Sequence, residues 1–324
     1  MRDLKQTTRN CKSATTILLL GMASILIGGC ASSKSVWGPE LKSANSIKHG
    51  SHAPTLNQAA DSALAKITEH EMSADEYEIL GDGLFKKGKI HIAYVQYEKS
   101  LQKAPDNIRV QYKLGLTLLA GKQFEAAITQ FQKVLEHDHR YSLAHQGIGT
   151  AYFQQKIYPK AEEHFQMALA LNSKLWQSNN YLGNIYDFQG RFKEAVQEYR
   201  LALSLKPDEG LIYMNIGVSY ALAGDHKKAV DAFGHALQNG YSNSKVYNNL
   251  GLSLAQLGKY QQALDAFTKA VGEARAYNNL GCVFLDQGKH QEAINCFEKA
   301  VAIDPKFYVK ADENLKKVKF GGLR

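Results

Sequence analysis

The chain has 324 residues with 44% hydrophobic and 22% charged side chains, six prolines and a formal net charge of +8. Few prolines, together with 17 tyrosines and 13 phenylalanines, favour an all-α protein built as a long array of small helical units. Four positive charges, Arg2, Lys5, Arg9 and Lys12, lie in the first twelve residues, and the others are spread among carboxylates. This distribution excludes a dense basic stripe and predicts no nucleic-acid partner.

Residues 1–29 have the layout of an export signal. A basic start is followed by an apolar run, and two small residues precede Cys30. The run is shorter than the ~20 residues that a helix needs to cross a bilayer, so a removed signal is favoured over a permanent span. The stretch Ile27 to Cys30 resembles the lipobox of bacterial lipoproteins, which implies cleavage before Cys30 and a lipid on that cysteine. The resemblance also implies the outer membrane, because Ala31 stands where lipoproteins retained at the inner membrane typically have Asp, so we expect an anchor in the inner leaflet of the outer membrane, facing the periplasm.

Residues 30–72 comprise the lipidated cysteine and a tether. Residues 31–52 are rich in Ser, Ala, Lys and His and contain too little apolar surface to fold alone. Residues 57–71 place Ala60, Leu64 and Ile67 on one helical face. This pattern predicts a short helix that shortens the tether and caps the following structure.

A period of 34 residues governs the rest of the chain. Six glycines recur at this spacing, an alanine follows each after twelve residues, and an aromatic residue follows each alanine after four more. A seventh set follows after a step of 30. The sets are Gly81, Gly115, Gly149, Gly183, Gly217, Gly251 and Gly281; Ala93, Ala127, Ala161, Ala195, Ala229, Ala263 and Ala293; and Tyr97, Phe131, Phe165, Tyr199, Phe233, Phe267 and Phe297. The period predicts seven helical hairpins that cover one another's apolar faces.

The repeat resembles the tetratricopeptide repeat, most completely in YLGNIYDFQGRFKEAVQEYRLALSLKP at residues 181–207. The resemblance implies an all-α, right-handed α-solenoid of seven helix-turn-helix units. These units span residues 74–107, 108–141, 142–175, 176–209, 210–243, 244–273 and 274–307. The short step removes about one helical turn, so we expect a shorter second helix and loop in repeat six and a local change in curvature there. Residues 308–324 are expected to form a capping helix and tail.

The resemblance also implies a concave surface lined by the first helix of each unit. Several positions that would face it hold asparagines, whose carboxamides can pair with both groups of an extended peptide backbone. The candidate groove residues are Asn180, Asn184, Asn215, Asn248, Asn249, Asn278, Asn279, Tyr112 and Met214. An alternative stays open, in which these amides only hydrate the groove or bond to neighbouring helices.

Other candidate sites are weak. Cys282 and Cys296 lie on the two helices of repeat seven but should point to opposite faces, which favours two free, buried thiols. The stretch from His137 to His139 fits a loop between repeats better than a metal site. Because no phosphate-binding loop or catalytic motif is present, we expect no enzyme activity, no cofactor and no metal.

Export signal, lipobox, tether and seven repeats together resemble tetratricopeptide lipoproteins of pilus assembly, especially the TadD family of the tight-adherence (Flp) system. The resemblance lies mainly in this order of segments, and its closest local match is the YNNLG sequence at residues 247–251 and 277–281. It implies a scaffold that holds peptide segments during assembly of a pilus or secretin. The alternative is an adaptor for cell-wall or exopolysaccharide synthesis enzymes.

The lipobox assignment makes a direct prediction. Cys30→Ser should leave an uncleaved precursor that incorporates no labelled fatty acid, because the serine hydroxyl cannot take the place of the thiol. Metabolic labelling and the mass of the purified chain measure both effects. Normal labelling of the variant would contradict the assignment.

Overall fold

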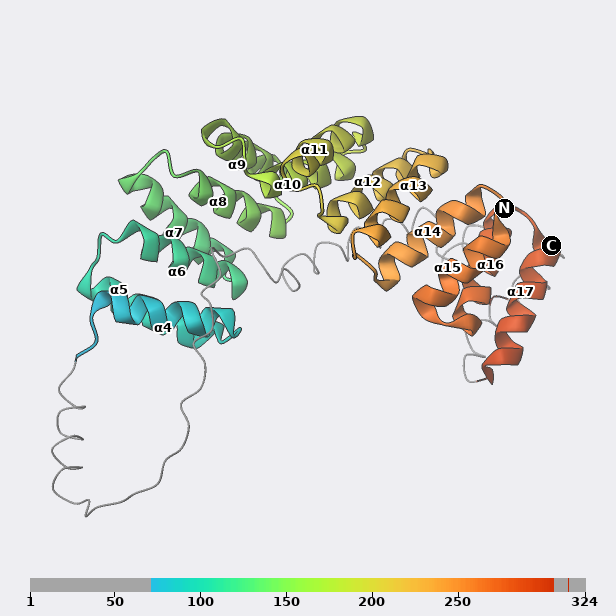
Figure 1. Ribbon diagram of the computed structural model, residues 1–324, viewed down its shortest axis with the longest axis horizontal. Helices are drawn as coiled ribbons and strands as arrows, with labels where there is room; N and C mark the ends of the chain where they lie inside the picture. The colour runs from blue at the N-terminus through green and yellow to red at the C-terminus, as the bar shows by residue number, and fades with distance from the viewer. Residues whose placement is uncertain (1–70, 306–313, 315–324) are drawn as a thin grey trace, which may run out of the picture. The chain divides into compact units, whose positions relative to one another are not determined.

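The computed structural model describes residues 71–305 and Asn314, and all regular elements among them are helices (Figure 1). The all-α prediction is therefore confirmed as a helical repeat fold. The helices are α4 (Ala74–Lys86), α5 (Ile90–Lys103), α6 (Ile108–Ala120), α7 (Phe124–His137), α8 (Ser142–Gln154), α9 (Tyr158–Leu171), α10 (Trp176–Phe188), α11 (Phe192–Leu205), α12 (Gly210–Leu222), α13 (His226–Gln238), α14 (Ser244–Gln256), α15 (Tyr260–Val271), α16 (Glu273–Asp286) and α17 (His290–Ile303). The predicted signal, Cys30, most of the tether and nearly all of the predicted capping helix lie outside the described residues.

The described chain divides into two compact units, residues 71–156 and residues 157–305 with Asn314. In the first unit, α4 packs on α5 and α6 on α7 as antiparallel hairpins, and α8 lies against α7 and α6 (Figure 1). In the second, α9 lies against α10, and four hairpins follow, from α10–α11 to α16–α17. Each unit has an apolar core along its stack of helices.

A close contact between a glycine and an aromatic ring recurs in these hairpins. A Cβ atom placed on Gly217 would lie 2.5 Å from a ring carbon of Phe233, well inside van der Waals contact. The same contact joins Gly81 to Tyr97, Gly115 to Phe131, Gly183 to Tyr199, Gly251 to Phe267 and Gly281 to Phe297. These six contacts explain the spacing of the glycines and aromatic residues: the glycine is small so that the ring can lie against its backbone.

The turn between the two helices of a hairpin needs a left-handed residue. Gly190 has φ +75°, and glycines occupy this place in five of the repeats. Lys122 (φ 59°) and Lys156 (φ 64°) adopt the same conformation in the other two. A left-handed conformation costs a residue with a Cβ roughly 1–2 kcal/mol, which glycine avoids.

The junction between repeats six and seven is compressed, as the 30-residue step predicts. Gly272 alone separates α15 from α16, whereas four residues separate α5 from α6. Helix α15 has 12 residues and α5 has 14. The packing register survives, because Gly281 meets Phe297 as in the other hairpins. The predicted change in curvature stays a prediction.

The two cysteines of repeat seven differ. Cys296 has a free, buried thiol as predicted, whereas Cys282, which is also buried, is not free, so the prediction of two free thiols holds for Cys296 alone. Burial raises the pKa of Cys296 to about 11 and keeps this thiol protonated at neutral pH.

None of the helices in the described part of the chain combines the length and the apolar character of a membrane span.

The glycine contact can be tested within one hairpin. Gly217→Ala should lower the free energy of unfolding by about 1–3 kcal/mol, because the new methyl group overlaps Phe233. Gly234→Ala on α13 meets nothing within 4 Å and should raise it by about 0.5–1 kcal/mol through helix propensity. Urea denaturation of both variants measures the difference, and equal effects would contradict the contact's role.

Candidate functional site

Asparagines on the first helices of the second unit bond across neighbouring repeats. Asn215 Nδ2 on α12 donates to Asn180 Oδ1 on α10 at 2.9 Å. Asn279 Nδ2 on α16 donates to Asn248 Oδ1 on α14 at 3.1 Å. These bonds support the alternative in which the amides join helices. Each carboxamide has two donor hydrogens and an acceptor with two lone pairs, so a single bond leaves capacity for a ligand.

The row of amides extends to Asn314. Its Nδ2 donates to Asn278 Oδ1 at 3.2 Å, and the residue is 3% exposed. Asn314 is therefore packed against α16, the first helix of repeat seven.

Burial separates the candidate groove residues into two groups. The buried residues are Asn180, Asn215, Asn249, Asn278 and Met214; the half-buried residues are Tyr112, Asn184, Asn248 and Asn279. Met214 is 0% exposed and lies in the apolar core with Val218 and Phe233, so its predicted place in an open groove is corrected. A long, unbranched thioether side chain fills core gaps readily, which accounts for its inward position.

Three buried polar atoms in this region have no hydrogen-bond partner within the described residues. They are Asn215 Oδ1, Asn249 Nδ2 and Ser253 Oγ, on the consecutive first helices α12 and α14. An unsatisfied buried polar atom costs roughly 1–3 kcal/mol. A bound polar group that reached these atoms would recover this free energy.

A buried carboxylate was not anticipated from the sequence. Asp187 Oδ2 on α10 accepts hydrogen bonds from Tyr199 Oη on α11 at 2.9 Å and from Ser219 Oγ on α12 at 2.8 Å. Burial raises the pKa of Asp187 to about 7, although these two hydrogen bonds act in the opposite direction. Tyr199 Oη also lies 2.8 Å from Asn184 Oδ1, so this candidate groove amide belongs to the same cluster.

The sequence contains a signal for this cluster. Asp187 occupies a position that is apolar in the six other repeats, namely Phe85, Leu119, Phe153, Ala221, Ala255 and Leu285. Tyr199 stands where five repeats have phenylalanine. When an acid and a hydroxyl replace apolar groups in the same repeat, the two are expected to form a hydrogen bond with each other.

The first unit carries charges where the second carries amides. Glu78 on α4 is buried and accepts from Arg109 Nε and Nη2 at 2.7 and 2.6 Å and from Lys113 Nζ at 2.6 Å. Lys113 also pairs with Asp82, whose Oδ1 accepts from Tyr97 Oη at 2.8 Å. Burial raises the pKa of Glu78, but the bonds from Arg109 and Lys113 outweigh it and hold the pKa below its usual value. These charges join the first helices of repeats one and two.

Tyr112, the candidate apolar anchor in this unit, lies among other rings. Its centroid is 5.7 Å from that of Phe131 and 5.4 Å from that of Tyr141. Burial raises the pKa of Tyr112, so its hydroxyl stays neutral. The half-buried ring can contribute apolar surface to a ligand without reorganisation.

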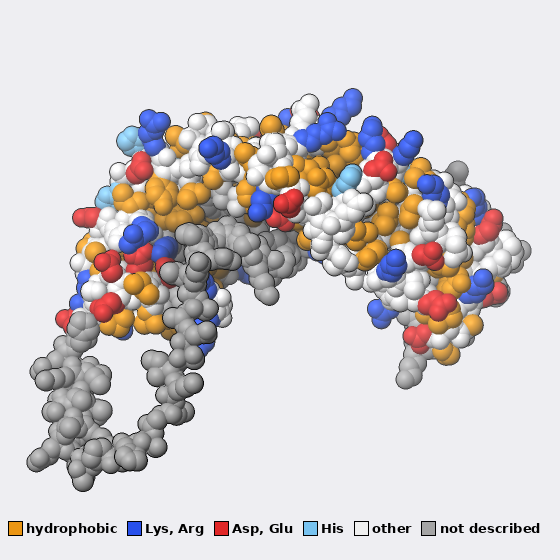
Figure 2. All heavy atoms as spheres, in the orientation of Figure 1, with side chains coloured by type: hydrophobic (Ala, Val, Ile, Leu, Met, Phe, Trp, Pro, Cys, Tyr) orange, Lys and Arg blue, Asp and Glu red, His pale blue; other side chains and the backbone are white. Residues whose placement is uncertain are grey.

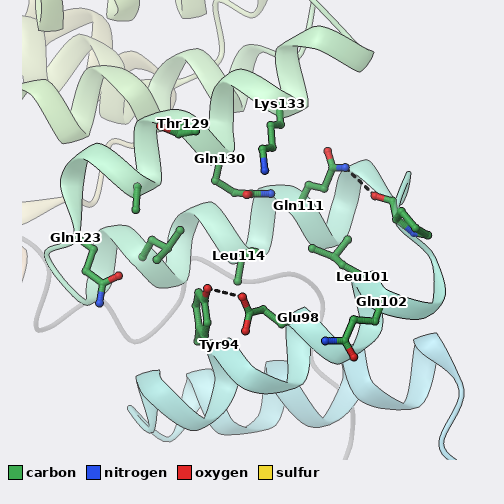
Figure 3. Close-up of a pocket in the computed structure, with 13 residues that line it drawn as sticks. Tyr94, Glu98, Leu101, Gln102, Gln111, Leu114, Gln123, Thr129, Gln130 and Lys133 are labelled. Atoms are coloured by element: carbon green, nitrogen blue, oxygen red, sulfur yellow. Dashed lines mark hydrogen bonds between the residues drawn. The ribbon is translucent and has the colours of Figure 1, made fainter.

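A hollow lies between the second helices of adjacent repeats, and we call it the furrow. In the first unit it has a volume of about 760 Å³, with Tyr94, Glu98 and Leu101 of α5 facing Thr129 and Lys133 of α7 (Figure 3). Leu114 and Gln111 of α6 form its floor. Gln111 Nε2 donates to the carbonyl of Pro105, and its Oε1 has no partner among the described residues.

The furrow recurs in the second unit with a volume of about 410 Å³. There Gln166 and Leu169 of α9 face Glu198 and Leu201 of α11 across Leu182 of α10. Eight of its ten lining residues occupy the same repeat positions as residues of the first furrow, so the furrow is a product of the stacking. Burial raises the pKa of Glu198.

Charges are mixed on the face shown in Figure 2, where lysine and arginine side chains alternate with acidic and apolar ones. Across the described residues, no three histidine, cysteine or acidic side chains gather in a group that could hold a metal ion.

Family models described as tetratricopeptide repeat match residues 106–174, 176–209, 244–272 and 274–307, about half of the chain. Among curated proteins, no relative matches the sequence.

Solved structures share the fold. The APC/C hetero-tetramer Cut9–Hcn1 matches with a TM-score of 0.56 at 20% identity over 80% of this chain and 51% of the other. A tetratricopeptide repeat protein from Parabacteroides merdae matches with a TM-score of 0.52 at 17% identity, over 76% and 98%. Pseudomonas aeruginosa pilF matches with a TM-score of 0.50 at 22% identity, over 64% and 95%. At these identities the similarity establishes the fold alone.

The Asp187 cluster predicts a pH-dependent stability. The folded chain holds this proton up to about pH 7, while the unfolded chain releases it near the ordinary value of 3.8. Stability should therefore fall as the pH rises from 5 to 8, by about 2–3 kcal/mol from this residue. Asp187→Asn should remove that part of the slope in urea denaturation, and the exposed control Asp231→Asn should keep it. Equal slopes in wild type and Asp187→Asn would contradict the buried-acid interpretation.

Proposed function

Because the chain belongs to the tetratricopeptide repeat family, whose repeats act as protein–protein interaction scaffolds, we propose that it captures extended peptide segments of its partners. The capture surface consists of Asn184, Asn248 and Asn279 in the second unit, whose amides hold the peptide backbone. In the first unit, the half-buried ring of Tyr112 offers a separate contact for an apolar side chain.

One observation carries this proposal. The first helices α14 and α16 bear the half-buried pair Asn248 and Asn279, whose single mutual hydrogen bond leaves further donor and acceptor capacity on both carboxamides. A peptide backbone offers N–H and C=O groups at regular intervals, and these groups can use the remaining capacity of the two amides. Binding of this kind reads the backbone and tolerates many sequences.

We further propose that the scaffold is a lipoprotein held at the outer membrane through Cys30 and facing the periplasm. Support comes from the export signal and from the lipobox at residues 27–30. Two or three acyl chains on one cysteine would hold the protein firmly, because each buried methylene contributes about 0.8 kcal/mol.

The proposed role is assembly of an envelope machine such as a Flp or type IV-like pilus or its secretin. The lipoprotein architecture with seven repeats supports this role through its resemblance to the TadD family. Segments of secretin or pilus subunits are the expected peptide ligands.

The peptide surface can be tested with a partner obtained by cross-linking in cells. Synthetic segments of that partner, measured by fluorescence anisotropy, should bind about tenfold or more weakly to Asn248→Ala/Asn279→Ala, since one or two hydrogen bonds are lost. Asn295→Ala, which removes an amide from the exposed side of α17, should bind as wild type does.

Circular dichroism must show both variants folded. Unchanged affinity in the double variant would refute the amide surface, and a set of partners made only of glycan-synthesis enzymes would refute the pilus role.

A further inference from the structure

The first hairpin has an uncovered apolar patch. Leu80 on α4 is 42% exposed, and Ile92 and Val95 on α5 are 49% and 43% exposed. In five other repeats the residue equivalent to Leu80 is buried: Leu114, Ile148, Leu182, Ile216 and Leu280. In each of those repeats the second helix of the preceding repeat packs on the first helix. The first repeat lacks such a helix among the described residues.

The furrow between α5 and α7 shows what normally lies against these positions. Its floor includes Leu114 and its α7 side includes Ala126 and Thr129, and α5 faces them with Tyr94, Glu98 and Leu101 (Figure 3). Leu80, Ile92 and Val95 stand one repeat earlier at the positions of Leu114, Ala126 and Thr129. The patch is therefore half of a furrow, for which residues 71–305 provide no facing helix.

The composition of this half-furrow is peculiar to the first repeat. The positions of Ile92 and Val95 carry small or polar residues in every other repeat. The equivalent pairs are Ala126 and Thr129, Lys160 and Glu163, Glu194 and Gln197, Lys228 and Asp231, Gln262 and Asp265, and Glu292 and Asn295. Two large apolar side chains at these positions favour an apolar helix facing them, whereas the later repeats can have polar residues on the facing helix.

We propose that residues 57–69 of this chain form that helix and act as the second half of an eighth, incomplete repeat. Shifted by one period of 34 residues, Ala60, Leu64 and Ile67 take the positions of Tyr94, Glu98 and Leu101, the three α5 residues that face the furrow. In the half-furrow, Leu64 thus stands at the position of Glu98, and Val95 stands at the position of Thr129. The two sides of the half-furrow match in character.

The chain leading into α4 fits the same register. Residue 69 corresponds to Lys103, the last residue of α5, and Ser73 corresponds to Asn107. Ser73 caps α4 through a capping box with Glu76, and Asn107 caps α6 through Val110 N. A helix ending at residue 69 would therefore reach α4 through a four-residue connection like that between α5 and α6.

Glu71, the first described residue, lies at the carboxyl end of α5, where its carboxylate is 2.7 Å from Lys103 Nζ. A helix that entered there and ran antiparallel to α4 would lie over Leu80. With residues 57–69 docked, the part of the chain left to act as a tether ends near residue 56, so the helix sets the reach of any anchor. The proposal holds whether or not the chain binds peptides.

Hydrogen exchange measured by mass spectrometry on the full chain tests the docking. Amides of residues 57–69 should exchange about tenfold or more slowly than in an unstructured peptide. Val95→Glu places a charge in the exposed patch and should abolish this protection while α4 to α8 stay protected. Thr129→Glu, the same change one repeat later, is the matched control and should leave residues 57–69 protected.

A second variant separates docking from general destabilisation. Leu64→Lys should lose the protection, and Leu64→Lys combined with Val95→Glu should regain part of it through a new ion pair. Exchange of residues 57–69 at the free-peptide rate in the wild type would overturn the proposal. A wild-type dimer that Val95→Glu converts to monomers, seen by light scattering, would overturn it in favour of a second copy on the patch.

Discussion

Each of the six hairpins with the glycine contact depends on an aromatic ring that occupies the space where any other residue at the glycine position would have its Cβ atom. The glycine removes the Cβ, the ring moves against the backbone, and a buried alanine leaves room beside it. Burying one such ring contributes roughly 1.5–3 kcal/mol, and no hairpin is wide enough to bury it without its neighbours. The stack is therefore a consequence of a packing problem that a single repeat cannot solve.

Polar groups modulate this common packing from one repeat to the next. Where the ring is a phenylalanine, the contact is purely apolar. Where it is Tyr97 or Tyr199, its hydroxyl meets Asp82 or Asp187 on the first helix. The two units thus carry different chemistry on equivalent positions: a network of opposite charges in one, and amides with a neutralised acid in the other. One backbone plan supports surfaces with distinct preferences.

The sequence alone predicts the helical fold and the small and aromatic positions, because a fixed period repeated seven times averages out local exceptions. It also predicts the shortened junction at Gly272, because only the second helix and the loop of repeat six can lose a helical turn without changing the packing register. It predicts the site less well. Met214 occupies a position that faces the groove in the family, yet its flexible side chain turns into the core. The hydrogen bonds between asparagines, such as that from Asn279 to Asn248, depend on the distance between helices, which the sequence pattern does not give. Asp187 can be recognised as a buried acid only when the equivalent positions of all repeats are compared, because the other repeats have apolar residues there.

Gly272 joins two helices with a single residue at φ +85° and ψ 162°, a conformation open almost only to glycine. A connection of four residues, like that between α5 and α6, leaves room to cut the array between repeats, whereas the single residue between α15 and α16 leaves none. Repeats six and seven therefore act as one module, and an engineer who wished to lengthen or shorten this array would cut it upstream of Ser244.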